Sequence, residues 1–142
     1  MPASLTIEEA YEYIDSRPGW ITLTTIGRDG MPHSIPIGYF REGDVVYVGG
    51  RPGTQKMKNA ARNPNVSLLL QSGSSMQDIK GLMIQGTATV YDRPDDVLRL
   101  MRAAAKWRGV PEDQWPAEAR AGAAYIGVMP VRMISWDYSR EA

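Results

Sequence analysis

Tight turns separate the first three β-type segments of this chain, and they restrict its fold more than any other feature. Trp20–Ile26 alternates β-branched and apolar residues, a pattern typical of a strand. A hairpin signal, Arg28-Asp29-Gly30, follows it, and Glu42-Gly43-Asp44 separates the next two segments. Parallel neighbours need a crossover of roughly a dozen residues, so these short connections predict antiparallel pairing. The sequence predicts an antiparallel meander over Trp20–Ile26, His33–Phe40 and Val45–Val48.

The rest of the chain supplies further strands. Val66–Gln71 is an almost continuous apolar run, which predicts a strand buried on both faces. Lys80–Tyr91 predicts a long strand in which Gly86 marks a bulge or a bend. Ala123–Tyr138 predicts either a strand pair or a single strand kinked around Met129-Pro130.

Short helices lie between these strands. Thr6 and Glu9 have the spacing of a capping box, and the apolar positions after them predict a helix that ends at Arg17-Pro18-Gly19. Two further helices are predicted, over Gln55–Arg62 with Thr54 as its cap and from about Pro94 with Asp92 as its cap. Pro111–Ala124 predicts a short helix interrupted near Pro116.

These elements together indicate the fold class. Six or so mostly antiparallel strands with small helices between them favour an α+β barrel over a doubly wound parallel sheet. No repeat, linker or low-complexity stretch divides the 142 residues, a length typical of one domain. We therefore expect residues 1–142 to form a single domain.

The composition excludes several kinds of functional site. The chain has no cysteine and one histidine, His33, which removes thiolate catalysis and multi-histidine metal sites and disfavours a histidine-based triad. Sixteen basic and sixteen acidic residues cancel, which argues against a nucleic-acid or membrane-surface partner. No stretch is long enough to span a membrane and the N-terminus lacks a signal-peptide core, so we expect a cytoplasmic protein. An enzyme with this composition needs a bound organic cofactor.

The strongest candidate for a binding site is the glycine-rich stretch Gly49–Lys56. It leads into a helix start, where free backbone N–H groups and the helix dipole favour an anion. Thr54 adds a hydroxyl group and Lys56 adds an ammonium group. An ordinary capped connection between a strand and a helix explains the same pattern equally well.

Helical geometry separates the cations of this segment. The side expected to be buried comprises Met57, Ala60 and Ala61. Lys56 lies at the border of that side and is expected to reach a ligand, whereas Lys58 and Arg62 are expected to face solvent.

A second candidate lies in the strand around Pro32–Gly38. Pro32 and Pro36 remove backbone donors, which predicts an edge or bulged strand whose backbone is able to face a ligand. His33 and Tyr39 are candidate proton donors. Four aromatic residues could stack on a ligand, although core packing or a subunit contact is the simpler explanation for them: Tyr39, Trp107, Tyr125 and Trp136.

Four motifs occur in an order that resembles a known superfamily. They are R-D-G-x-P-H-x-x-P-I (Arg28–Ile37), G-T-Q-K-x-K-N (Gly53–Asn59), N-P-x-V-S-L-L (Asn63–Leu69) and G-x-A-x-V (Gly86–Val90). Together they resemble the flavin-binding split-barrel superfamily. That superfamily contains the pyridoxamine 5′-phosphate oxidase-like proteins and the deazaflavin reductases that use coenzyme F420.

The resemblance implies an α+β fold, a six-stranded antiparallel split β-barrel with small peripheral helices. It also implies a homodimer with cofactor sites at the subunit interface, and we expect Trp136 and Tyr138 to contact the partner. The loop and helix start would hold the cofactor phosphate, and the proline-containing strand would lie along the ring. The implied cofactor-binding residues are Ser34, Ile35, Pro36, Ile37, Gly38, Gly53, Thr54, Gln55, Lys56, Lys58 and Asn59.

Two departures from the superfamily's pattern bear on the activity. Gln55 stands where its flavin oxidases often have arginine, and the C-terminus lacks the Arg/His segment of pyridoxamine phosphate oxidases. We therefore expect an oxidoreductase that transfers a hydride between coenzyme F420 and a small unsaturated organic substrate. The alternatives are an FMN-dependent oxidase or reductase, a non-catalytic flavin- or haem-binding protein, and a dimeric interaction module. No catalytic residue and no metal ligand is assigned.

Overall fold

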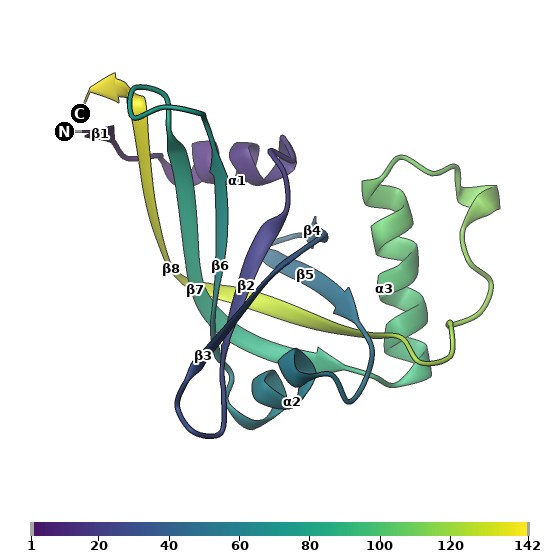
Figure 1. The fold of residues 1–142 in the computed structure, drawn as a ribbon. Helices are drawn as coiled ribbons and strands as arrows, with labels where there is room; N and C mark the ends of the chain where they lie inside the picture. The colour runs from purple at the N-terminus through teal and green to yellow at the C-terminus, as the bar shows by residue number, and fades with distance from the viewer. Residues whose placement is uncertain (1, 142) are drawn as a thin grey trace.

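The computed structural model describes residues 2–141, which form a curved sheet with three α-helices around it (Figure 1). The strands are β1 (Pro2–Ala3), β2 (Ile21–Ile26), β3 (Pro32–Ile37), β4 (Tyr39–Glu42), β5 (Val45–Gly50), β6 (Asn65–Ser72), β7 (Lys80–Tyr91) and β8 (Ala124–Glu141). The helices are α1 (Ile7–Asp15), α2 (Gln55–Arg62) and α3 (Pro94–Trp107), with a short 3₁₀ turn at Glu112–Gln114.

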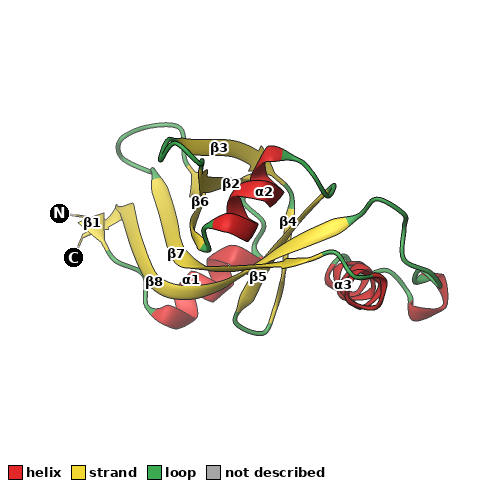
Figure 2. Ribbon diagram, turned by 90° about the horizontal axis from the view of Figure 1, so that it is seen from below, coloured by secondary structure: helices red, strands yellow, loops and turns green. Residues whose placement is uncertain are grey.

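The sheet is antiparallel throughout, as the short turns predict. Its strand order is β3-β2-β6-β7-β8-β5-β4, and β1 pairs with β8 outside this path. The two end strands, β3 and β4, are consecutive in the chain and are separated only by Gly38. The sheet therefore curls until its ends approach each other, and Figure 2 shows the resulting barrel. The fold is an α+β split barrel. It has eight strands instead of six because β1 adds a two-residue strand and the segment 33–40 is divided.

The predicted meander is wrong in one respect. The segment His33–Phe40 is not one strand, because Gly38 interrupts it. The part before Gly38 pairs with β2, and the part after it pairs with β5 at the other end of the sheet. The prediction of an edge strand is confirmed, because β2 is the one partner of β3 among the described strands.

The longest strand pair, β7 with β8, carries a bulge opposite Gly86. Gln85 pairs with Arg132 and Gly86 pairs with Pro130, which leaves Val131 as the extra residue. A Cβ atom on Gly86 would lie 2.5 Å from the Met129 carbonyl oxygen, so only glycine fits this position. The C-terminal segment is thus one long strand with a bulge at its centre.

The core fills the inside of the barrel. Its largest fully buried side chains come from α1 and from β2, β5, β6, β7 and β8, and include Ile14, Leu23, Leu68, Leu82, Ile84 and Ile126. The burial of β6 alternates along the strand, so the prediction that both its faces are buried is wrong. Its outward-facing side chains are half-buried or exposed. A smaller cluster of Phe40, Tyr47, Leu100 and Ala104 fixes α3 against the barrel.

The predictions for the helix ends are partly confirmed. The capping box of α1 is present, with Thr6 Oγ1 accepting from the Glu9 N–H at 3.1 Å and Glu9 accepting from the Thr6 N–H at 2.9 Å. The cap of α3 is Arg93 instead of Asp92, and it makes no side-chain capping bond. The predicted helix within 111–124 is reduced to the 3₁₀ turn. Within the described chain, no helix has the length and apolar character needed to cross a membrane.

Candidate cofactor site

The start of α2 presents unpaired backbone donors. Thr54 has the extended backbone of an N-cap, but its hydroxyl does not cap the helix. It donates instead to the Arg51 carbonyl at 2.8 Å. The N–H groups of Gln55, Lys56 and Met57 consequently find no acceptor within residues 2–141. Three amide hydrogens at a helix start form a local positive potential that suits an anion.

Lys56 adds a cation to this helix start. Its side chain is half-buried and folds over Gly50, where a Cβ atom would lie 2.4 Å from the lysine Cε and 2.6 Å from Nζ. No acidic group of the described chain pairs with it, and burial lowers the pKa of its ammonium group. An unpaired, half-buried ammonium group gains most from an anion, because an opposite charge offsets its lost hydration.

The other two cations of α2 behave differently from each other. Lys58 is exposed, as predicted. Arg62 is exposed too, but its guanidinium group turns back to donate to the Ile26 carbonyl at 3.2 Å and to Asn59 Oδ1 at 3.0 Å. Arg62 therefore helps to attach α2 to β2, and the prediction that it faces away is only partly correct.

Asn59 is fully buried, and both the nitrogen and the oxygen of its side-chain amide form hydrogen bonds within the protein. Its Nδ2 donates to Thr25 Oγ1 at 3.0 Å, while its Oδ1 accepts from Gln55 Nε2 at 2.7 Å and from Arg62. The predicted buried side of α2 is corrected accordingly, because Asn59 is buried and Ala61 is exposed. Asn59 thus joins α2 to β2 and orients Gln55 at the helix start.

The implied ring-binding strand, β3, turns its two faces to different surroundings. Ile35 and Ile37 point inward and pack against the core. Ser34 and Pro36 are exposed on the outer face, and Ser34 Oγ lies 2.8 Å from Thr24 Oγ1 on β2. The side chains of Ile35 and Ile37 are thus occupied by packing, so contact with a ligand would use the strand's backbone and its outer face.

The free edge of β3 is rich in hydrogen-bond acceptors. The Gly27 N–H donates to the Met31 carbonyl at 2.8 Å, and this bond sets the alternation of the β2–β3 ladder. By that alternation, Pro32, Ser34 and Pro36 direct their backbone groups to the free edge. Proline has no N–H, so these residues offer three carbonyl acceptors and one donor, the Ser34 N–H. Such an edge resists pairing with another strand and leaves backbone groups for a flat polar ligand.

The structure brings β3 and α2 together around one cavity of about 490 Å³. Figure 2 shows α2 beside β3. The β2–β3 turn and His33 line one side of the cavity, and Gln55 and Asn59 line the other. His33 lines this cavity, and its Nδ1 is buried without a hydrogen-bond partner in the described structure. The two segments singled out from the sequence therefore face a common space, at the end where β3 begins.

The candidate proton donor Tyr39 is committed elsewhere. Its hydroxyl donates to the Ile14 carbonyl at 2.6 Å, and burial raises the pKa of Tyr39 to about 12. Its ring packs against Trp107, with ring centroids 6.3 Å apart. A phenol with a raised pKa that donates its proton to a backbone carbonyl stabilises the fold and is poorly suited to proton transfer. Of the two candidates, His33 alone keeps a ring nitrogen without a hydrogen-bond partner in the described structure.

The sequence did not single out Gly50 as a contact of Lys56. Gly50 follows Gly49 in a loop-like sequence, yet the structure places both glycines inside β5. The sequence did contain a signal for such a contact, because glycine in a strand often marks the close approach of another group. What no local pattern shows is which group approaches.

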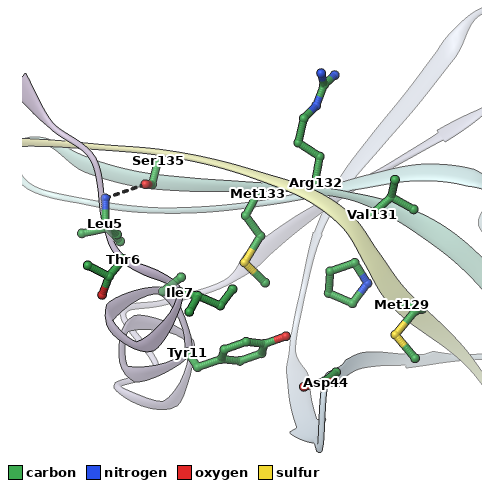
Figure 3. Close-up of a pocket in the computed structure, with 12 residues that line it drawn as sticks. Leu5, Thr6, Ile7, Tyr11, Asp44, Met129, Val131, Arg132, Met133 and Ser135 are labelled. Atoms are coloured by element: carbon green, nitrogen blue, oxygen red, sulfur yellow. Dashed lines mark hydrogen bonds between the residues drawn. The ribbon is translucent and has the colours of Figure 1, made fainter.

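A further hollow of about 550 Å³ lies between α1 and β8 (Figure 3). Met129, Val131 and Met133 of β8 and Ile7 and Tyr11 of α1 line it, and the Arg132 side chain points away from it in Figure 3. None of the residues predicted to bind a cofactor lines this hollow. Its apolar rim is relevant to assembly and is considered below.

Comparison with known proteins adds to this geometry. A family model described as pyridoxamine 5'-phosphate oxidase matches residues 7–128. No curated protein is similar enough in sequence to count as a match.

Solved structures share the fold. A conserved hypothetical protein from Mycobacterium tuberculosis is 24% identical with a TM-score of 0.79, and the match covers 94% of this chain and 86% of that chain. A putative 5-nitroimidazole antibiotic resistance protein from Bacteroides thetaiotaomicron is 18% identical with a TM-score of 0.75, covering 95% and 86%. An F420 reductase is 22% identical with a TM-score of 0.64, covering 86% and 94%.

These structural likenesses agree with the split barrel built above from strand order. The family model extends the likeness to the sequence itself, from α1 to the first part of β8. The chain therefore belongs to the pyridoxamine 5'-phosphate oxidase family, a flavin-binding family.

Proposed function

We propose that this protein is an oxidoreductase that uses coenzyme F420 to transfer a hydride to or from a small unsaturated organic molecule. The observation that carries the proposal is the start of α2, where three unpaired N–H groups and the unpaired Lys56 ammonium group suit a phosphate. The flavin-binding character of the family supports a flavin-like ring beside it.

The site residues fit such a group in separate ways. Lys56 and the N–H groups at the start of α2 would hold the phosphate. The free edge of β3 would receive the ring, with the Ser34 N–H and the carbonyls of Pro32 and Pro36 as its hydrogen-bonding groups. When bound, the reduced ring supplies the hydride. The chain's own residues would bind, orient and desolvate the reactants, because none of the candidate proton donors has a defined acid–base partner.

The choice of F420 over FMN rests on two points. Gln55 is neutral where flavin oxidases of the superfamily often have arginine, and an F420 reductase shares the fold. The alternative of a flavin is supported by a similar structure described as the FAD-binding protein from Mycobacterium smegmatis, 16% identical with a TM-score of 0.65. A flavin bound without catalysis stays an alternative of a different class.

We further propose a homodimer that closes the cofactor site. Apolar side chains are exposed on β8 around its bulge. In the single chain, the exposed fraction is 49% for Met129 and 75% for Val131. Adjacent apolar residues at this exposure are typical of a surface that a partner covers. Of the two residues expected at the interface, Tyr138 is exposed, whereas Trp136 is half-buried and lies over Gly81. Val131 therefore replaces Trp136 as the central expected contact.

The cofactor is tested by titrating the apo-protein with F420 and with FMN and following ligand fluorescence. Submicromolar binding of F420 with much weaker binding of FMN supports the proposal, and the reverse order favours the flavin alternative. Absence of binding by either compound contradicts the proposed function altogether. Turnover of the bound, reduced cofactor with unsaturated test substrates then separates an enzyme from a storage protein.

A further inference from the structure

We propose that the hollow between α1 and β8 binds an extended, basic peptide segment of another protein, which pairs with β8 as an added strand. The hollow has a volume of about 550 Å³, within the range of ligand sites (Figure 3). None of the residues proposed to bind the cofactor lines it, so this inference does not rest on the proposed function.

One edge of β8 is paired along most of its length, whereas the other edge has a gap. β7 occupies the first edge. On the other edge, β5 pairs with residues 124–128, and β1 pairs with Asp137 and a residue beyond it. Residues 129–136 therefore have no described strand on that side. The hollow lies in this gap, because it is lined by Asp44, which precedes β5, and by Leu5, which follows β1.

The backbone of β8 presents unpaired hydrogen-bonding groups to the gap. The Tyr138 N–H donates to the Ile79 carbonyl at 3.0 Å, which places Tyr138 among the residues whose backbone groups face β7. Alternation along the strand then directs the N–H and carbonyl groups of Met133 and Ser135 away from β7. Neither N–H group donates to an acceptor in the described chain. Two donors and two acceptors at alternate residues are the pattern with which a strand edge receives a peptide.

The walls of the hollow suit the side chains of such a peptide. Met129 and Met133 of β8 and Ile7 of α1 form its apolar side, and Ile7 is exposed in the single chain. Methionine side chains adapt to partners of different shapes. The Leu5 N–H donates to Ser135 Oγ at 2.8 Å, so the protein's own N-terminal segment closes one end of the gap. At about 3.4 Å per residue, the remaining edge accommodates a strand of roughly four to six residues.

The flanking strands give the peptide a direction and a charge. β5 and β1 both run antiparallel to β8, so a strand placed between them in the same direction has its C-terminal end beside Asp44. Asp44 makes no ion pair within residues 2–141. Arg41 does not neutralise it, because its guanidinium group is held by Asp15 at 2.7 Å and by the Gly43 carbonyl at 2.6 Å. A basic residue near the C-terminal end of the peptide would compensate this carboxylate.

The helix beside the hollow extends the negative charge. α1 carries Glu8, Glu9, Glu12 and Asp15 and no basic residue. Glu9 and Asp15 pair with arginines, whereas Glu8 and Glu12 make no ion pair within the described part of the chain. Such a rim favours a basic partner and disfavours an acidic one. A second copy of this protein would bring the same acidic helix, so the charge favours another protein as the occupant.

The test titrates isotope-labelled protein with the peptide acetyl-Val-Thr-Val-Thr-Lys-amide and follows the backbone amide signals by NMR. The signals of Met133 and Ser135 are expected to shift, and their hydrogen exchange is expected to slow. Two isomers of the peptide carry N-methyl groups on alternate backbone nitrogens. An added strand pairs through every second residue, so one isomer is expected to bind about tenfold more weakly and the other as well as the parent peptide. Equal affinities of the two isomers, or no shift at millimolar peptide, overturn the proposal.

A second arm tests the charge. Asp44→Asn is expected to weaken peptide binding about two- to fivefold, as for an exposed ion pair. Asp92→Asn removes an exposed acid outside the hollow and is expected to leave binding unchanged. Melting temperatures show that each variant is folded. Equal effects of the two substitutions overturn the assignment of a basic peptide.

Light scattering of the protein with and without the peptide distinguishes the occupants. An unchanged number of protein chains per particle is expected when the peptide is bound. If the peptide instead converts a dimer into monomers, the edge belongs to a contact between two copies and the proposal of another protein is overturned.

Discussion

Two lysines only two residues apart on α2 have different surroundings. Lys56 is half-buried over Gly50, and Lys58 is exposed. The sequence predicts this difference from helical spacing alone. It does not predict that the Thr54 hydroxyl turns to Arg51, because a capping residue has several backbone acceptors within reach and loop geometry decides among them.

Replacing Lys56 by alanine is expected to weaken cofactor binding by about ten- to a hundredfold, since it removes a charge-assisted hydrogen bond of about 1.5–3 kcal/mol. Lys58→Ala is the matched control and is expected to change the affinity little, because its charge is screened by solvent. Fluorescence titration of both variants, beside their melting temperatures, measures this. Equal losses would contradict the assignment of Lys56 to the phosphate.

The same site predicts a pH dependence of binding. Burial lowers the pKa of Lys56 below the ordinary value, so its charge is lost at a lower pH than that of a free lysine. The affinity for a phosphate-bearing cofactor is expected to fall as the pH rises through that lowered pKa, and this fall is expected to be absent in Lys56→Ala. Titrations at a series of alkaline pH values test it, and an identical pH profile in both proteins would argue against a charged Lys56 at the site.

Tyr39 gives a prediction for stability at alkaline pH. Its pKa is raised to about 12 in the folded state, so the neutral phenol favours folding. That contribution is fully present below pH of about 10, the ordinary tyrosine pKa, and is lost as the pH rises towards 12. Tyr39→Phe is expected to lower the free energy of unfolding by about 0.5–1.5 kcal/mol at neutral pH, because the hydrogen bond to Ile14 is removed. As the pH rises above 10, the free energy of unfolding is expected to fall less in this variant than in the wild type. Urea unfolding at both pH values measures the difference.

At the scale of elements, local patterns predict the strands and helices but not their arrangement. Turn signals and alternation predicted the bounds of β2, β5 and β7 to within about two residues, because strand bounds of this kind depend on neighbouring residues. The bulge between β7 and β8 was signalled by Gly86 and by Met129-Pro130, and this prediction is confirmed. The break at Gly38 depends on which distant strands pair, so no short stretch of sequence reveals it. The position of α2 is likewise fixed by a tertiary contact, the buried Asn59.

Asn59→Ala is expected to lower the free energy of unfolding by about 1–3 kcal/mol, because it leaves buried Thr25 without its partner. It should also weaken cofactor binding, since Gln55 and the start of α2 lose their attachment to β2. Thr25→Val removes the other half of the same bond. The double variant is expected to lose less than the sum of the single variants, and strict additivity by urea unfolding would show that the contact is not coupled.

At the scale of the whole molecule, the barrel of a single chain is small compared with the proposed cofactor. The cavity at β3 and α2 opens at the surface of one chain, so a second copy would complete the enclosure that hydride transfer favours. The sequence predicted a partner through the superfamily resemblance and through its length, because a barrel of 142 residues leaves a flavin-sized cofactor partly open on one face. Composition carries no such signal, because exposed apolar residues become a patch only after folding.

Val131→Lys is expected to convert the proposed dimer into a monomer, because it places a charge in an apolar interface. Met76→Lys changes a similarly exposed apolar residue in the β6–β7 loop and is the control, with no change of mass expected. Light scattering at micromolar concentration gives the masses. A wild-type protein that is already monomeric would refute the dimer directly.

The position of β8 in the sheet has a consequence for how the protein acquires its fold. Among the described strands, the β4–β5 hairpin pairs with the rest of the sheet through β8 alone, and β8 is the last of them. During synthesis, the hairpin that carries Gly50 therefore has no strand to pair with until β8 has left the ribosome. Pairings between such distant segments are slow, so refolding is expected to take milliseconds to seconds. Cofactor binding is then expected to recover no earlier than the docking of β8, so the phosphate site would report the completion of folding.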